Sequence, residues 1–283
     1  NTAVGSQALD ANTTASSNTA IGYGTLSANT TGDFNTALGS TALLKNTTAN
    51  NNVSVGYQSL YDNTTGTSNT ALGTNALGNN TTASNNTAVG YQSLLANTTG
   101  YGNTASGKDA MRLNTTGYYN SAYGYQCLEN NTTGVANVAV GRNTLYANTT
   151  ASNNTAVGYN ALTSDTLGST STAIGYSALE TQNFTSAENS LNTAVGYTAG
   201  RSITTGRQNV IVGAQTGDAL TVGELNTAVG QNALSADTKG NRSVAIGNSA
   251  LRFQNFTNAT DTYNTAVGYA AGIAVTTGTN NTL

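Results

Sequence analysis

The chain repeats a short motif every 17 residues, and this period constrains its fold more than any other feature. A glycine preceded by a segment such as Asn-Thr-Ala-Val recurs at intervals of 17 from Gly5 to Gly175, and then, with two intervals of 21, as far as Gly268. Sixteen copies together fill the sequence of 283 residues. A period of this length is typical of solenoids, in which each repeat packs only on its neighbours.

The pattern within one copy predicts β-structure. Counting from the glycine as position zero, position −1 is apolar in most copies and position −3 is Thr or Val in all copies but one. This spacing puts both side chains on one strand face. Position +4 is Leu in twelve copies and Met111 in another. Asn-Thr-Thr at +7 to +9 predicts a polar corner. We therefore expect strand, corner, short strand and corner in each copy, with one or two aliphatic side chains pointing inward.

Such a copy cannot fold alone. Burying a Val and a Leu contributes roughly 1.5–3 kcal/mol each, whereas ordering costs about 1.5 kcal/mol per residue. Stacking is therefore required, and the absence of proline agrees with backbone N–H groups that all donate to neighbouring copies. The predicted fold is all-β, a parallel β-solenoid or β-roll of about 16 rungs, roughly 75–80 Å long at about 4.8 Å per rung.

Two regions differ in regularity. Residues 1–175 form regular 17-residue repeats, and residues 176–283 continue the same solenoid with four-residue insertions near 182–185 and 254–257. The insertions lie 72 residues apart, which gives the second region a longer repeat of its own. Neither end carries a distinct capping sequence, so we expect a fragment of a longer array.

Aromatic residues give the candidate interaction surface. Tyrosine occupies position +1 in alternate copies, and this column could form a platform for sugars, a docking stripe between protomers or a simple stacked ladder. Each insertion carries one phenylalanine, which we expect to form an apolar bump for lateral docking of one solenoid on another. The residues are Tyr23, Tyr57, Tyr91, Tyr125, Tyr159, Phe184 and Phe256.

The composition argues against catalysis. The chain has no His and one Cys, which removes His-based acid–base chemistry and His/Cys metal sites. Nine Lys and Arg make no basic patch for nucleic acid, and no apolar run reaches the roughly 18 residues of a membrane span. We expect a non-enzyme without catalytic residues, metal or cofactor. Cys127 is interpreted as a small core residue, and the cluster of Lys108, Asp109 and Arg112 as a solvated patch or a contact between protomers.

The repeat motif is similar to that of a known family. The Asn-Thr-Ala-Val-Gly cores and the Ser-Val-Ala-Ile-Gly core at 243–247 resemble the head repeats of trimeric autotransporter adhesins, over the whole chain. That resemblance implies a left-handed parallel β-roll assembled as a trimer. Those heads usually have a shorter rung, and the 17-residue form looks more like the repeat arrays of bacterial surface fibres and phage tail fibres.

These features together predict a structural protein. The first hypothesis is the self-associating rod of an extracellular fibre or adhesin, secreted to the cell surface for attachment to cells or surfaces. Its expected partners are further copies of the chain, three or more in number, and surface glycans of a target cell. The alternatives are the shaft of a phage receptor-binding tail fibre and an ice-binding β-solenoid, although adjacent Thr residues at the corner give no regular Thr-x-Thr face there.

Overall fold

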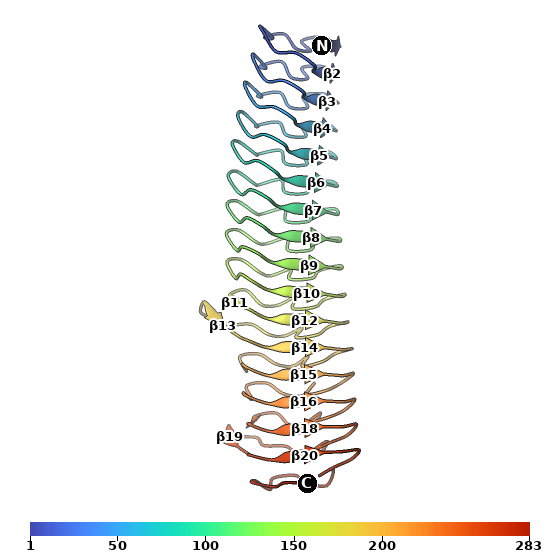
Figure 1. The fold of residues 1–283 in the computed structure, drawn as a ribbon, viewed down its shortest axis with the longest axis vertical. Helices are drawn as coiled ribbons and strands as arrows, with labels where there is room; N and C mark the ends of the chain where they lie inside the picture. Colours follow the sequence, from blue (N-terminus) through green and yellow to red (C-terminus); the bar gives the residue numbers. More distant parts are fainter. The chain divides into compact units, whose positions relative to one another are not determined.

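A computed structural model describes all 283 residues, which divide into two compact units, Asn1–Asn137 and Val138–Leu283. Each unit is a parallel β-solenoid without helices. In Figure 1 the coils of each unit lie one above another, with their strands in a column. The two units together contain sixteen three-residue strands, one per 17-residue copy, so the predicted fold class and period are confirmed.

The first unit contains eight of these strands, which pair in parallel in chain order. Residues that pair occupy the same position in consecutive copies, 17 residues apart in the sequence. Thr2 pairs with Thr19 in the next rung, and Thr19 pairs with Thr36 in the rung after it. The strands are β1 (Thr2–Val4), β2 (Thr19–Ile21), β3 (Thr36–Leu38), β4 (Val53–Val55), β5 (Thr70–Leu72), β6 (Thr87–Val89), β7 (Thr104–Ser106) and β8 (Ser121–Tyr123).

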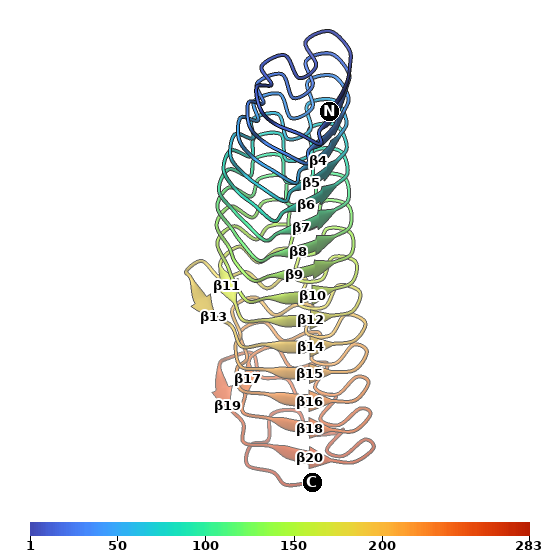
Figure 2. The same ribbon diagram turned by 45° about the horizontal axis from the view of Figure 1, so that its top comes forward.

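The second unit continues the pattern and adds two short parallel pairs, which lie away from the main strand column in both views (Figures 1 and 2). The pairs are β11 (Gly168–Ser169) with β13 (Glu188–Asn189) and β17 (Gly240–Asn241) with β19 (Thr260–Asp261). Each pair joins an insertion to the rung before it. The main strands are β9 (Val138–Val140), β10 (Thr155–Val157), β12 (Thr172–Ile174), β14 (Thr193–Val195), β15 (Val210–Val212), β16 (Thr227–Val229), β18 (Val244–Ile246) and β20 (Thr265–Val267).

The strands face the opposite way from our expectation. Their central residue, usually Ala, is fully buried, as at Ala20 and Ala37, whereas Ile21 and Leu38 are 38% and 45% exposed. The prediction that the aliphatic residues at −1 and −3 point inward is therefore wrong. The Thr that usually stands at −3 would need a hydrogen-bond partner inside. Where a leucine fills +4, the buried central position holds Ala or Ser, whereas Ile211 is buried there in the rung where Gly217 replaces the leucine.

The predicted burial of the leucines at +4 is confirmed, whereas the prediction of a second short strand in each copy is wrong. Leu43, Leu60 and Met111 at position +4 are fully buried, yet the segment around them consists of turns. Residues at +2, +4 and +12 adopt left-handed backbone conformations, for example Thr41 with φ 55° and Leu43 with φ 53°. Such a conformation costs a non-glycine residue on the order of 1 kcal/mol or more.

Hydrogen bonds between rungs offset this cost. The left-handed residues turn the chain sharply while their N–H groups stay directed along the stack. Thr41 N donates to Tyr23 O in the preceding rung at 2.8 Å, and Leu43 N donates to Ser59 O in the following rung at 3.0 Å. The turns are therefore paired with both neighbours in the way that a strand is, without being strands.

The glycine at position zero is required by close approach of neighbouring backbones. Gly39 has φ 127°, and a Cβ there would lie 2.7 Å from the carbonyl oxygen of Gly56 in the next rung. No side chain fits at that distance. This contact explains why the glycine is the least variable part of the repeat within this chain.

Two columns of asparagine run through the interior. At +7, Asn46 Nδ2 donates to Asn29 Oδ1 at 2.8 Å and to Ala49 O at 3.1 Å. At −4, Asn35 N donates to Asn18 Oδ1 at 2.8 Å. All four asparagines are buried. The chain bends at Asn-Thr-Thr, as predicted for a corner, but the amide of its Asn is part of the core.

The three copies without Leu at +4 fill the core from another position. Gly200, Gly217 and Gly272 replace the leucine, and the same copies carry Ile203, Leu220 and Val275 at +7 in place of Asn. A Cβ on Gly200 would lie 3.0 Å from the Ile203 Cδ1 atom. In the rungs of Gly200 and Gly217 the aliphatic side chain at +7 therefore occupies the space that a leucine at +4 fills elsewhere, together with Ile211 beside Gly217.

Candidate interaction surface

The last residue of each main strand contributes to an exposed, mostly apolar stripe. We call it the strand stripe. In the first unit it runs in register through Val4, Ile21, Leu38, Val55 and Leu72, all exposed or half-buried. The column at −3 beside it is mostly Thr. Extended apolar patches of this kind mark contact surfaces, and sequence analysis missed this one because it placed these side chains inside.

The tyrosine column stands one residue beyond the glycine. In the first unit, Tyr23, Tyr57 and Tyr91 are 55%, 51% and 47% exposed. Tyr91 and Tyr125 both face Lys108 between them, whose Nζ lies 5.8 and 5.7 Å from the two ring centroids. The prediction that these side chains lie on the surface is therefore consistent with the structure, and their role in contacts remains a prediction.

In the second unit the column becomes continuous. Tyr159, Tyr176 and Tyr197 stack with centroid distances of 5.2 and 5.3 Å and interplanar angles of 10° and 17°. Arg142 lies over the other face of Tyr159, 5.7 Å from its centroid. The rings stack on one another here, while Tyr176 and Tyr197 remain 49% and 55% exposed.

The two insertion phenylalanines do not form docking bumps. Phe184 and Phe256 are only 2% and 7% exposed, so the prediction that they project from the surface is wrong. Phe184 packs against Gly168, where a Cβ would lie 2.6 Å from the ring, and the Arg207 guanidinium lies 5.7 Å from its centroid. The ring holds the insertion against the preceding rung instead of offering it to a partner.

A buried carboxylate anchors each insertion. Asp165 stands at +7 and accepts hydrogen bonds from Gly168 N at 2.9 Å, Phe184 N at 3.3 Å and Gln182 Nε2 at 2.5 Å. Gln182 Oε1 in turn accepts a bond from Asn192 Nδ2 at 2.9 Å. The second insertion repeats this arrangement with Asp237, Phe256, Gln254 and Asn264.

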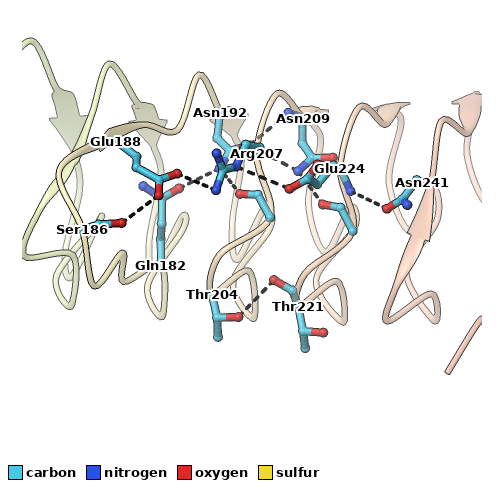
Figure 3. A network of polar contacts seen from close by, with 12 residues as sticks. Gln182, Ser186, Glu188, Asn192, Thr204, Arg207, Asn209, Thr221, Glu224 and Asn241 are labelled. Carbon is cyan, nitrogen blue, oxygen red and sulfur yellow. Dashed lines mark hydrogen bonds and ion pairs between the residues drawn. The ribbon is translucent and has the colours of Figure 1, made fainter. Parts of the chain in front are cut away.

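A polar network crosses the first insertion on the outside (Figure 3). Arg207 pairs with Glu188 at 2.5 Å and with Glu224 at 3.4 Å. Ser186 Oγ donates to Glu188 Oε1 at 2.7 Å. The hydrogen bond from Ser186, together with the Arg207 charge, lowers the pKa of Glu188. Because these groups are largely in solvent, the network positions the insertion more than it stabilises the fold.

The first unit also carries a cluster of three tyrosines that sequence analysis did not single out. Tyr101 and Tyr118 stack at 5.0 Å and 3°, and Tyr119 meets both edge-on at 5.1 and 5.3 Å. Desolvation is the largest cause that raises the pKa of Tyr101, followed by Tyr119. The sequence signal was aromatic residues at +11 and +12 in neighbouring copies, outside the +1 column.

The charged residues of the predicted cluster form ion pairs, and Cys127 lies in the core. Arg112 pairs with Glu129 at 2.7 Å, and Lys108 lies 3.8 Å from Asp109. Cys127 is fully buried, and burial raises the pKa of its thiol to about 12. Its interpretation as a core residue is confirmed. Its thiolate is therefore scarce at neutral pH.

The Asn-Thr-Thr triplets match the acceptor sequence for N-glycosylation. All of their asparagines except Asn12 are buried, and the amide nitrogen is already used: Asn63 Nδ2 donates to Asn46 Oδ1 and to Gly66 O. In the folded chain these amides are inaccessible, so the triplets serve the core.

No helix in the structure has the length and apolar character to cross a bilayer, and no group of three or more His, Cys, Asp or Glu side chains is placed to hold a metal ion. No protein-family model and no curated protein matches this sequence.

Proposed function

We propose that this chain is a structural component of an extracellular fibre or adhesin, in which copies associate side by side through the strand stripe. The observation that carries the proposal is the stripe itself. Leu38 and Leu72 are 45% and 47% exposed on a regular sheet, and covering such side chains gains about 25 cal/mol per Å² of apolar area removed from water.

The interior supports the structural half of the proposal. Rung-to-rung hydrogen bonds, two asparagine columns and the leucine core tie each copy to the next, so load on the chain is shared among many equivalent contacts. The sparse charge supports the self-associating half. Only 7% of the residues are charged and the net charge is −3, so repulsion between copies is weak.

The test compares two pairs of outward substitutions. Leu38→Asp with Leu72→Asp places carboxylates in the strand stripe, and Thr48→Asp with Thr82→Asp places them at exposed corner positions. We expect the wild-type chain and the corner variant to form oligomers of three or more copies in sedimentation velocity, and the stripe variant to be monomeric with an unchanged circular dichroism spectrum. A wild-type chain that stays monomeric at high concentration would contradict the proposal.

Ice binding is a second candidate because the strands present Thr outward. Thr2, Thr19 and Thr36 lie in register on adjacent strands, each two residues from an exposed aliphatic side chain. This gives a repeating array of hydroxyl and methyl groups on a sheet, which the corner threonines do not. A thermal hysteresis measurement distinguishes the candidates, since a self-associating fibre component that does not bind ice leaves the gap between freezing and melting unchanged.

A further inference from the structure

The tyrosine column of the first unit contains open slots. Tyr23, Tyr57 and Tyr91 stand two rungs apart, roughly 9.6 Å at about 4.8 Å per rung, with Ser40 and Thr74 in the rungs between them. Aromatic rings stack with centroids about 4.5–7 Å apart. Each gap is therefore wide enough for one further ring, in contact with a tyrosine on both sides.

The second unit shows such a slot filled by the chain itself. Tyr176 lies between Tyr159 and Tyr197 and stacks on them at 5.2 and 5.3 Å. The slot between Tyr91 and Tyr125 in the first unit is filled in another way, by the Lys108 ammonium at 5.8 and 5.7 Å. Both examples show that a site between alternate tyrosines takes a planar ring or a cation.

We propose that the two open slots, between Tyr23 and Tyr57 and between Tyr57 and Tyr91, receive tyrosine rings from the same column of a second copy of this chain. A second copy carries tyrosines at the same two-rung period, so displacing it by one rung brings each of its rings opposite a slot. An unrelated partner would have to match this period by chance. The inference rests on the proposed self-association and adds its register.

The strand stripe agrees with this occupant. Leu38 and Leu72 in the stripe lie two residues from Ser40 and Thr74, with only a glycine between each pair. A copy whose tyrosines enter the slots therefore brings its own column close to these exposed aliphatic side chains. The same contact covers both features.

The experiment fills the slots from within. Ser40→Tyr with Thr74→Tyr reproduces the stacked arrangement of Tyr159, Tyr176 and Tyr197, and Ser40→Lys with Thr74→Lys reproduces the slot at Lys108. The full chain of each variant is compared with wild type by sedimentation equilibrium. We expect both to weaken association at least tenfold, although the first makes the surface more aromatic.

Two control variants keep the test specific. Ser40→Ala with Thr74→Ala leaves the slots open, and Gln231→Tyr adds a ring to the same column outside them; both should associate like wild type. Circular dichroism confirms that each variant is folded. If the filled variants associate as tightly as wild type, the slot proposal is overturned and the proposed function stands. If wild type itself is monomeric, both are overturned.

Discussion

The regular rungs of the first unit and the insertion-bearing rungs of the second use different side chains at the buried position +7, and these side chains form different hydrogen bonds. Asn80 at +7 donates to the carbonyl of Ala83, three residues on. Asp165 at +7 accepts instead from the N–H of Gly168, also three residues on. In the regular rung a backbone carbonyl faces the side chain, and an amide donates to it. In the insertion-bearing rung a backbone N–H faces the side chain, and a carboxylate accepts from it.

The difference shows what makes the repeat propagate. An asparagine amide can both donate and accept, so each ladder residue satisfies the next one and the pattern continues without limit. A carboxylate only accepts. It ends the ladder at Asp165, and Gln182 restarts the network with an amide long enough to reach Asp165, Ser171 and Asn192.

The largest expected effect comes from breaking the regular ladder. Asn80→Leu removes the partner of Asn63 Oδ1 and one of two hydrogen bonds at both Asn97 Nδ2 and the Ala83 carbonyl, which keep Gly100 O and Asn69 Nδ2. The unpaired oxygen costs about 1–3 kcal/mol and each lost hydrogen bond about 0.5–1.5 kcal/mol, so the variant should lose roughly 3–5 kcal/mol in urea unfolding. Asn79→Leu, at the exposed neighbouring position, is the control. Equal losses in the two variants would show that the ladder is not a source of stability.

A second comparison concerns the rungs that fill the core from +7. Gly200→Leu forces a side chain against Ile203, and overpacking costs about 1–3 kcal/mol. Gly200→Leu with Ile203→Asn recreates a regular rung and should recover at least half of that loss. Thermal unfolding of the two single variants and the double variant gives the coupling. Additive losses would contradict the interpretation that the two positions share one space.

A smaller effect is expected where the ladder ends. Asp165→Asn turns the nitrogen of the new amide towards Gln182 Nε2, so two donors face each other, at a cost of about 1–3 kcal/mol. The matched variant is Asp33→Asn, whose carboxylate lies near the surface. Urea unfolding should separate the two. A stable Asp165→Asn variant would mean that the carboxylate is dispensable at the insertion.

The smallest effect is electrostatic. Since the pKa of Glu188 is lowered in the folded chain, the group contributes stability above its unfolded pKa of about 4.3, and this contribution is lost as pH falls through the folded value. Arg207→Gln should raise the pKa of Glu188 in an NMR titration. Arg252→Gln serves as the control. An unchanged pKa would show that Arg207 has no influence on the carboxylate.

The repeat arithmetic was sufficient to predict the solenoid, the period and the leucine core, because glycine and leucine recur at constant offsets. The direction of the strands was not predictable in that way. Thr-Ala-Val places Thr and Val on one face and Ala on the other, and hydrophobicity alone favours Val inside. The buried leucine at +4 takes the space that a larger side chain at the centre of the strand would need, and Leu43 reaches that space from a left-handed turn for which the sequence carries no glycine signal.

Part of the interaction surface was likewise predictable from the sequence and part was not. The tyrosine column was visible as a period, whereas the burial of Phe184 depends on contacts with Gly168 and Arg207 that no spacing reveals. The asparagine columns were hidden for a related reason. Asn-Thr-Thr is a common corner sequence, and its amide becomes a core group only because an identical amide lies one rung away.

The central claim is that copies of this chain associate through the strand stripe and the tyrosine column. Electron cryomicroscopy of the native full-length assembly, at a resolution that separates protomers in cross-section, tests it most directly. We expect several solenoids side by side, with Leu38 and Tyr57 in their contacts. A solitary solenoid with both features exposed to solvent would contradict it.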